Sequence, residues 1–234
     1  IRDSSSDKPT EAQAAADNET APAVVESPPA ESEPPIELPE LGASDLIARE
    51  MVGALSAHPR IAAWLATDDL IRRFTAAIVN IAEGATPKSH LGMMGPTGPF
   101  TTTRTRGVPH PSNESYARYD SVAEAFAGLD VPGTVRLYDQ LKPLLDEAFL
   151  ELGYPGEDFH RMLVTALDHL LATPAIEGEV ALEETVAAFK FADPDLEALS
   201  AAQKQLLRMG PENARRVQTK LGALRRALLA GGGN

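Results

Sequence analysis

Phe191–Leu221 reads FADPDLEALSAAQKQLLRMGPENARRVQTKL, and it predicts more local structure than any other stretch of this chain. Asp193 and Pro194 are typical of a helix start, because Asp caps free N–H groups and Pro fits the first helical position. Ser200 and Gln203, three residues apart, have the spacing of a capping box. The stretch therefore predicts two short helices in succession.

The next boundary in this stretch lies at Gly210 and Pro211. Gly suits the left-handed residue that follows a helix, and Pro suits the first position of the next helix. Beyond this corner, apolar residues recur at alternating spacings of three and four: Ala214, Val217, Leu221, Leu224 and Leu228. Because that spacing places them on one helical face, the C-terminal region is predicted as helix, sharp corner and amphipathic helix.

The same helical periodicity recurs through most of residues 42–234 and predicts one mainly α, multi-helix domain with a minor short β element. Ser112 or Asn113 is the expected cap of one helix reaching Leu129. Asp130 opens the next helix, which Pro143 should kink or split because it removes a hydrogen bond.

Two segments carry the expected β element. Residues 100–105 are rich in Thr and predict one short strand with little to pair with. Residues 176–191 are compatible with either a helix or two short strands. Apolar residues alternate at 180 and 182 and at 189 and 191, as they do in strands. We favour the two strands because Gly178 precedes them and Asp193 and Pro194 follow closely.

Residues 1–41 are predicted as a disordered, acidic, Pro-rich linker that precedes the domain. They contain seven Pro, ten acidic residues and two basic residues, a net charge of −8, with few apolar side chains to form a core. Either a passive linker or a spacer between an anchor and the folded domain fits this composition. We favour the spacer.

The whole chain has a net charge of −13 and no Cys. Such a charge makes a nucleic-acid partner unfavourable, and the missing thiols exclude a thiolate zinc site. No metal, cofactor or catalytic set is expected from the spacing of the five His residues.

Basic residues nevertheless gather near the Gly210 corner. The possible anion- or partner-binding set comprises Lys204, Arg208, Asn213, Arg215 and Arg216. A structural alternative is that Lys204 and Arg208 bind the last carbonyl groups of their helix and complement its dipole. Both interpretations remain open from the sequence.

One enzymatic alternative also remains. Tyr154, Asp158 and His160 could meet near a helix start and perform acid/base chemistry of the kind a hydrolase uses. That chemistry would require the side chains to reach one another in a cleft. We expect no catalysis here, but the spacing keeps this alternative open.

Several segments resemble a family of uncharacterised proteobacterial proteins that is catalogued as a domain of unknown function. The resemblance covers nearly all of residues 38–228 and rests on LPELGASD (38–45), WLATDDLIRRF (64–74), GPF (98–100), SYARYD (115–120), LYDQLKPLLDEAF (137–149), ELGYP (151–155), LLATP (170–174) and FADPDLEALSAAQKQLLRMGPEN (191–213). GVPHPSNE (107–114) follows the family pattern only loosely. No site residues are established for the family.

The resemblance implies a single-pass membrane protein: a transmembrane helix, an acidic Pro-rich linker and then this domain. We therefore expect an anchor upstream of Ile1, an inner-membrane location and a domain that faces the periplasm. The function we expect is a non-catalytic interaction or scaffold module with protein partners in the cell envelope. Binding of an anionic ligand by the basic C-terminal helices is a further alternative.

Overall fold

The computed structural model describes residues 37–186 and 188–231, so nearly all of the predicted N-terminal linker lies outside the described residues. The packed part of the chain begins before residue 42, where the sequence placed the boundary. Leu38 packs against the hydrophobic core, and Leu41 is buried within it.

The described part is mainly helical, as predicted. Its first half contains a 3-10 turn at Leu41–Ala43, then α1 (Asp45–Leu55), α2 (Pro59–Leu65), α3 (Leu70–Ala82), two further 3-10 turns (Pro87–Ser89 and Gly92–Met94), β1 (Thr102–Thr105), β2 (Val108–Pro111), α4 (Asn113–Ala117) and α5 (Asp120–Ala127). Its second half contains α6 (Val131–Glu151), α7 (Phe159–Leu171), β3 (Leu182–Glu184), β4 (Phe189–Phe191), α8 (Pro194–Glu197), α9 (Ala201–Leu207) and α10 (Pro211–Gly231).

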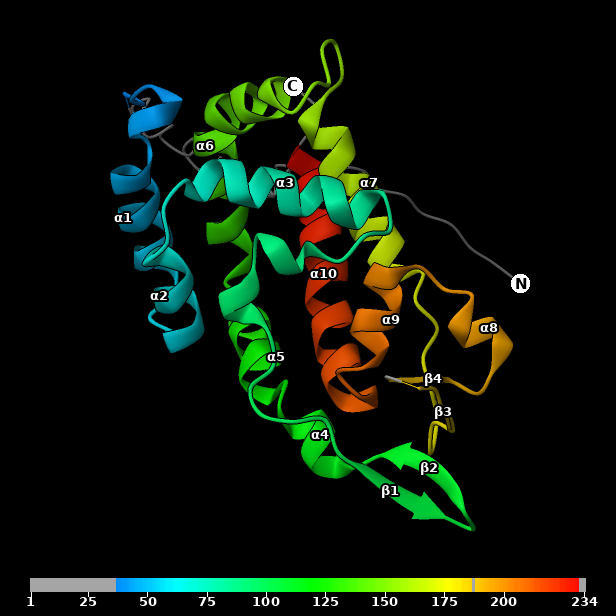
Figure 1. The fold of residues 1–234 in the computed structure, drawn as a ribbon. Helices are drawn as coiled ribbons and strands as arrows, with labels where there is room; N and C mark the ends of the chain where they lie inside the picture. Colours follow the sequence, from blue (N-terminus) through cyan, green and yellow to red (C-terminus); the bar gives the residue numbers. More distant parts are fainter. Residues whose placement is uncertain (1–36, 187, 232–234) are drawn as a thin grey trace, which may run out of the picture. The chain divides into compact units, whose positions relative to one another are not determined.

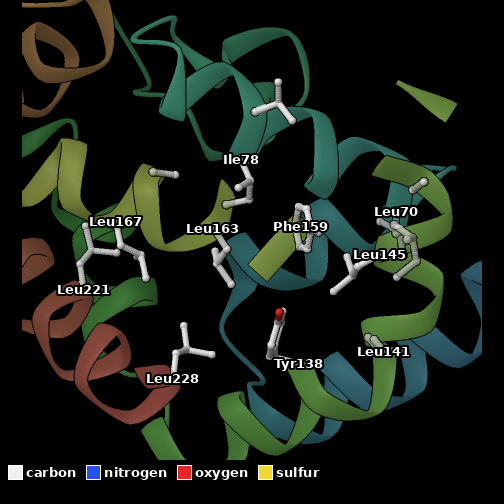
Figure 2. Close-up of a cluster of buried hydrophobic side chains, with 14 of the residues drawn as sticks. Leu70, Ile78, Tyr138, Leu141, Leu145, Phe159, Leu163, Leu167, Leu221 and Leu228 are labelled. Carbon is white, nitrogen blue, oxygen red and sulfur yellow. The ribbon is translucent and has the colours of Figure 1, made fainter. Parts of the chain in front are cut away.

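The core lies where α3 crosses α6 and α7 and where α10 runs along α5, α6 and α7 (Figure 1). Figure 2 shows leucines from α3, α6, α7 and α10 in one cluster with Phe159, which is fully buried. Each such side chain contributes about 1.5–3 kcal/mol by leaving water. The apolar stripe predicted on α10 is confirmed, since Val217, Leu221 and Leu228 belong to this core.

Two hairpins lie at one end of the described part, next to α4, α8 and α9 (Figure 1). In the first, β1 pairs antiparallel with β2, with Thr102 opposite Pro111. In the second, β3 pairs antiparallel with β4, with Leu182 opposite Phe191. The two strands favoured within residues 176–191 are therefore confirmed.

The two hairpins contact each other through β2 and β3. His110 Nδ1 lies 3.0 Å from the carbonyl oxygen of Val180, and Arg104 forms a 2.5 Å ion pair with Glu184. These two contacts join residues that are 70 and 80 positions apart in the chain. The hairpin end is thus held by polar contacts across long sequence separations.

Two local predictions were wrong. The strand predicted at residues 100–105 does have a partner, β2, although β2 contains Pro109 and Pro111. The single helix predicted from Ser112 to Leu129 is divided into α4 and α5. The helix α6 is continuous through Pro143, which is exposed to solvent, so of the two outcomes predicted at Pro143 the split does not occur.

The longest helices of the described residues, α6 and α10, both have too many polar residues to cross a bilayer, and no other described helix meets the requirement.

Candidate functional site

The corner predicted at Gly210 positions the candidate site. Ser200 Oγ accepts a hydrogen bond from Gln203 N and Gln203 Oε1 accepts one from Ser200 N, so the predicted capping box is present. Gly210 has a φ of 87°, and a Cβ there would lie 2.6 Å from the ring of Tyr116. Only Gly combines a positive φ with the absence of a Cβ next to Tyr116. The chain can therefore turn at Gly210 and begin α10 directly, and Arg208 is left at the end of α9 beside the second hairpin.

Lys204, the first residue of the predicted set, serves a structural role. Its Nζ donates to Glu197 Oε1 at 2.7 Å and to the Glu197 carbonyl oxygen at 2.9 Å. Glu197 Oε2 also accepts from Phe191 N at 3.0 Å. The hydrogen bond from Lys204 and then the one from Phe191 hold the pKa of Glu197 below its usual range. This network fastens α8 to α9 and β4.

Asn213 is buried and also joins elements of the fold. Its Nδ2 donates to Asp120 Oδ1 at 2.8 Å, to the Met209 carbonyl oxygen at 3.2 Å and to the Tyr116 carbonyl oxygen at 3.3 Å. The start of α10 is therefore fixed to the junction of α4 and α5. All of these acceptors belong to the protein, so the amide acts as a joint in the fold.

Arg215 and Arg216 lie on a different surface from Arg208. Both line a shallow hollow of about 570 Å³ along α10, together with Lys220. Arg216 forms a 2.5 Å ion pair with Glu212, and Lys220 Nζ donates to the Leu129 carbonyl oxygen. The structure thus divides the predicted set instead of gathering it into one basic patch.

Arg208 lines a cavity of about 640 Å³ between the two hairpins and α9. Asn213 and Arg216 instead line a neighbouring cavity. We call the cavity at Arg208 the aromatic groove, and its lining is formed by Phe100, Pro111, Tyr116, Arg118, Leu182, Glu184, Thr185, Ala188, Phe189, Lys190, Phe191, Leu207 and Arg208. Three bases and one acid contribute to this lining, a basic balance in a chain whose net charge is −13.

A row of rings with a guanidinium at each end runs through the aromatic groove. The Arg118 guanidinium lies 5.5 Å from the Phe100 ring centre, and the Phe100 and Phe189 ring centres are 5.5 Å apart. Phe189 and Phe191 share one face of β4, because alternate residues of a strand point the same way. The Arg208 guanidinium lies 5.8 Å from the Phe191 ring centre. We call these five residues the aromatic row.

The two guanidiniums of the aromatic row differ in how the fold holds them. The charge of Arg208 contributes to the lowered pKa of Glu197. Arg118 donates from Nε to the Ser115 carbonyl oxygen and from Nη1 to the Gly98 carbonyl oxygen, each at 3.1 Å. Arg208 is exposed at the end of α9. Within residues 37–186 and 188–231, neither side chain forms an ion pair.

A second cavity, of about 840 Å³, adjoins the aromatic groove and shares Pro111 and Tyr116 with it. We call it the acidic hollow, because its lining includes the carboxylates of Glu114, Asp120, Glu124, Glu179 and Glu212. Burial and then the charge of Glu179 raise the pKa of Tyr116. Tyr116 therefore remains a neutral phenol between two cavities of opposite charge.

The residues of the enzymatic alternative make separate contacts. Asp158 Oδ1 accepts from His160 N and caps α7, whereas His160 Nδ1 lies 3.0 Å from the Tyr138 hydroxyl. Tyr154 stacks on Phe149 and donates to a carboxylate of α3's C-terminal turn, Glu83 Oε1, at 2.5 Å. That contact raises the pKa of Tyr154. Acid/base chemistry at these residues stays a prediction, and the contacts give each side chain a structural role.

No group of three or more His, Asp or Glu side chains able to hold a metal ion occurs among the residues that the structure describes. The aromatic groove offers different chemistry. Aromatic faces bind apolar groups, and guanidiniums bind carboxylates or phosphates through paired hydrogen bonds. The arrangement is therefore suited to binding a ligand with apolar and anionic parts.

Sequence reasoning named only Arg208 among the residues that line the groove. It missed the rest of the aromatic row: Phe100, Arg118, Phe189 and Phe191. Each lies in a segment that the sequence predicts as helix or strand, and no local pattern there indicates a binding site. No periodicity links Phe100 to Phe189, because only the packing of one hairpin beside the other brings them together. The available signal was the scarcity of aromatic residues, at 5% of the chain, combined with their concentration near the predicted strands.

The fold and site define a mainly helical domain whose two hairpins enclose an aromatic, basic groove. The family model described as a protein of unknown function (DUF3014) matches residues 70–225, and the chain belongs to that family. The match runs from the start of α3 into α10 and includes every residue of the aromatic groove. Neither the curated proteins nor the solved structures contain a match to this chain.

Proposed function

We propose that this protein is a non-catalytic interaction module and that the aromatic groove is the surface where a segment of a partner protein docks. The observation that carries the proposal is the aromatic row: three Phe rings line a cavity whose end groups are unpaired guanidiniums. Aromatic and Arg side chains are the residue types enriched at protein interfaces. The groove's charge is complementary to an acidic partner segment.

Exposed apolar residues around the hairpins support this assignment. Phe100 is 40% exposed and Val108 is 41% exposed, and Val186 at the turn between β3 and β4 is fully exposed. Exposed apolar side chains that gather beside a cavity are a common mark of an interaction surface. A docked partner segment would remove them from water.

The envelope location is part of the same proposal. The sequence resembles membrane-anchored proteins with an acidic, Pro-rich linker, and this supports an inner-membrane anchor with the domain in the periplasm. A linker of that composition lets a tethered domain search for partners near the membrane. The partner is accordingly expected to be another envelope protein.

Photo-crosslinking in the native host tests the docking surface. A photoreactive amino acid replaces Phe100 or Phe189 in the full-length protein, and Leu46, which is 76% exposed on α1, serves as the matched control position. We expect the groove positions, and not position 46, to crosslink to the same protein segment. That segment, made as a synthetic peptide, should bind the purified domain.

Equal crosslinking from positions 46, 100 and 189 would contradict the docking proposal. A synthetic segment that binds the Phe189→Ala variant as tightly as the original protein would also contradict it. Location is tested separately, with alkaline phosphatase fused after Asn234. Phosphatase activity is expected only if the C-terminus is exported, and an inactive fusion that is stably expressed would overturn the periplasmic placement.

A further inference from the structure

We infer that the segment bound by the aromatic groove carries an acidic residue at each end of a short apolar run. This inference rests on the proposed function and specifies its ligand. The geometry points to it because the aromatic row has a cation at both ends, Arg118 and Arg208, and three Phe rings between them. A segment with one acid, or with an acid in the middle, would leave one guanidinium without a partner.

The middle of the aromatic row is the part that recognises apolar side chains. Phe191 is buried and anchors the row in a small cluster with Val180, Leu182 and Leu207. Phe189 is half-buried, and Phe100 is exposed. The accessible ring surface therefore lies toward Phe100 and Phe189. An extended segment laid along these rings would bury apolar side chains at every second position.

The ends of the aromatic row are the parts that recognise carboxylates. The Arg118 guanidinium rests against both Phe100 and Tyr119, and two of its nitrogen atoms are already committed to backbone carbonyl groups. It is therefore oriented before a ligand binds, which reduces the entropy lost on binding. Arg208 rests against Phe191 and is exposed to solvent. A guanidinium on a ring face can still donate through its edge to a carboxylate.

The acidic hollow limits where the acids of the bound segment can lie. Beyond Tyr116 and Pro111, the neighbouring cavity has five carboxylates and the single guanidinium of Arg216 in its lining. Like charges placed opposite each other are unfavourable. Acidic residues are therefore unfavourable in any part of the bound segment that continues from the groove into that cavity. The two cavities together restrict the acids to the aromatic row.

A series of synthetic peptides tests the inference on the purified domain. Each peptide has an apolar middle of roughly three to six residues, a range that the strand rise of ~3.3 Å per residue makes suitable for the row. The ends are Glu and Glu, Glu and Gln in either order, Gln and Gln, or Lys and Lys. Fluorescence anisotropy of a dye on a flexible linker gives each dissociation constant.

We expect the peptide with two Glu ends to bind tightest and each Glu→Gln change to weaken binding roughly 3- to 10-fold. Lys ends should bind weakest. In the protein, Arg118→Gln should abolish the dependence on one peptide end, and Arg208→Gln should abolish the dependence on the other. Arg161→Gln, on the exposed face of α7, removes a base outside the groove and should change neither dependence.

Three results separate failure of the inference from failure of the proposed function. If peptides bind but Gln ends bind as tightly as Glu ends, the acidic pattern is wrong and the docking function stands. The pattern is also wrong if a crosslinked partner segment lacks the two acids. If no peptide binds and crosslinking from Phe100 and Phe189 finds no partner segment, both are wrong.

Discussion

The helical core and the hairpin end of this protein use aromatic residues in opposite ways. In the core, Phe149 and Phe159 pack edge to face, with ring centres 5.6 Å apart, and each is at most 1% exposed. At the hairpin end, Phe100 and Phe189 pack at nearly the same distance, 5.5 Å, but Phe100 remains 40% exposed. The same ring-to-ring contact is thus buried in the core and partly exposed to solvent at the hairpin end.

This difference in burial indicates that the core rings contribute mainly to stability and the hairpin rings mainly to binding. A fully buried ring is already removed from water, so its loss mainly changes the free energy of unfolding. A partly exposed ring beside an unpaired guanidinium still has apolar surface to bury, so its loss mainly changes binding. Substitutions in the two regions should therefore separate these quantities.

The largest expected effect is in the core. Phe159→Ala should lower the free energy of unfolding by about 3–5 kcal/mol, because it leaves a cavity between α6 and α7 where no solvent enters. Urea-induced unfolding followed by circular dichroism measures this change. A loss below about 1 kcal/mol would show that the site collapses around the missing ring and would weaken the contrast between the regions.

Substitution of Gly210, at the corner between α9 and α10, should have the next largest effect on the free energy of unfolding. Gly210→Ala should cost about 2–3 kcal/mol, because Ala is strained at a φ of 87° and its Cβ would press on Tyr116. Gly153→Ala is the matched control, since Gly153 also has a positive φ, of 94°, but a Cβ there meets nothing within 4 Å. Thermal unfolding of both variants isolates the clash with Tyr116. Equal losses would mean that the close approach contributes nothing.

At the hairpin end, Phe189→Ala is the counterpart of Phe159→Ala in the core. Phe189→Ala should lower the free energy of unfolding by only about 1 kcal/mol, because its ring is half-buried and belongs to the edge of a small cluster. It should weaken binding of the partner segment roughly tenfold or more. Paired unfolding and anisotropy measurements check both values. A stability loss as large as that of Phe159→Ala would abolish the distinction drawn here.

The smallest expected effect concerns a surface ion pair on the core. Arg72 donates hydrogen bonds to Glu151 from Nε at 2.6 Å and from Nη2 at 2.9 Å. This side-chain hydrogen bonding lowers the pKa of Glu151. A carboxyl whose pKa is lower when folded stabilises the fold above its unfolded pKa, and this stabilisation disappears as the pH falls through the folded pKa.

Glu151→Gln should therefore lower the melting temperature slightly at pH 7, by less than any substitution above, and the difference should vanish in acid. Added salt should also reduce it, because both side chains are exposed. Glu50→Gln, a change at an exposed position on α1, controls for the loss of charge alone. A difference that persists below the lowered pKa would show that the ion pair is not its cause.

The boundaries in Phe191–Leu221 were determined by local sequence. Asp193 caps α8, Ser200 and Gln203 form the capping box, and Gly210 takes the left-handed conformation. Each of these features depends on side chains within three residues of the backbone groups that they satisfy. The prediction succeeded there because the interactions that decide the structure are local.

The division of residues 113–127 into α4 and α5 was decided by tertiary structure. In one continuous helix, the Tyr116 carbonyl oxygen would accept from the N–H of residue 120. Here it accepts from Tyr119 N at 3.0 Å and from the distant amide of Asn213 at 3.3 Å. Sequence periodicity cannot register a donor that arrives from about 100 residues away.

Exposure explains why α6 is not split at Pro143 and why β2 tolerates two Pro residues. Pro143 is exposed on α6, so the carbonyl group that loses its helical partner can bind water and the helix continues. Pro109 and Pro111 are tolerated in β2 because each strand of a two-stranded sheet has an unpaired edge. Which side of an element meets solvent is a property of the fold.

The sequence by itself determined the helical class, the corner at Gly210 and the position of Arg208 at the end of a helix, since all of these follow from neighbouring residues. The tertiary structure decided that Arg208 completes an aromatic row, while Lys204 and Asn213 became joints of the fold. The physical reason is that a polar side chain is committed or left free by the acceptors that folding brings to it. Glu197 of the preceding helix binds Lys204, and Asp120, 93 residues away in the chain, binds Asn213.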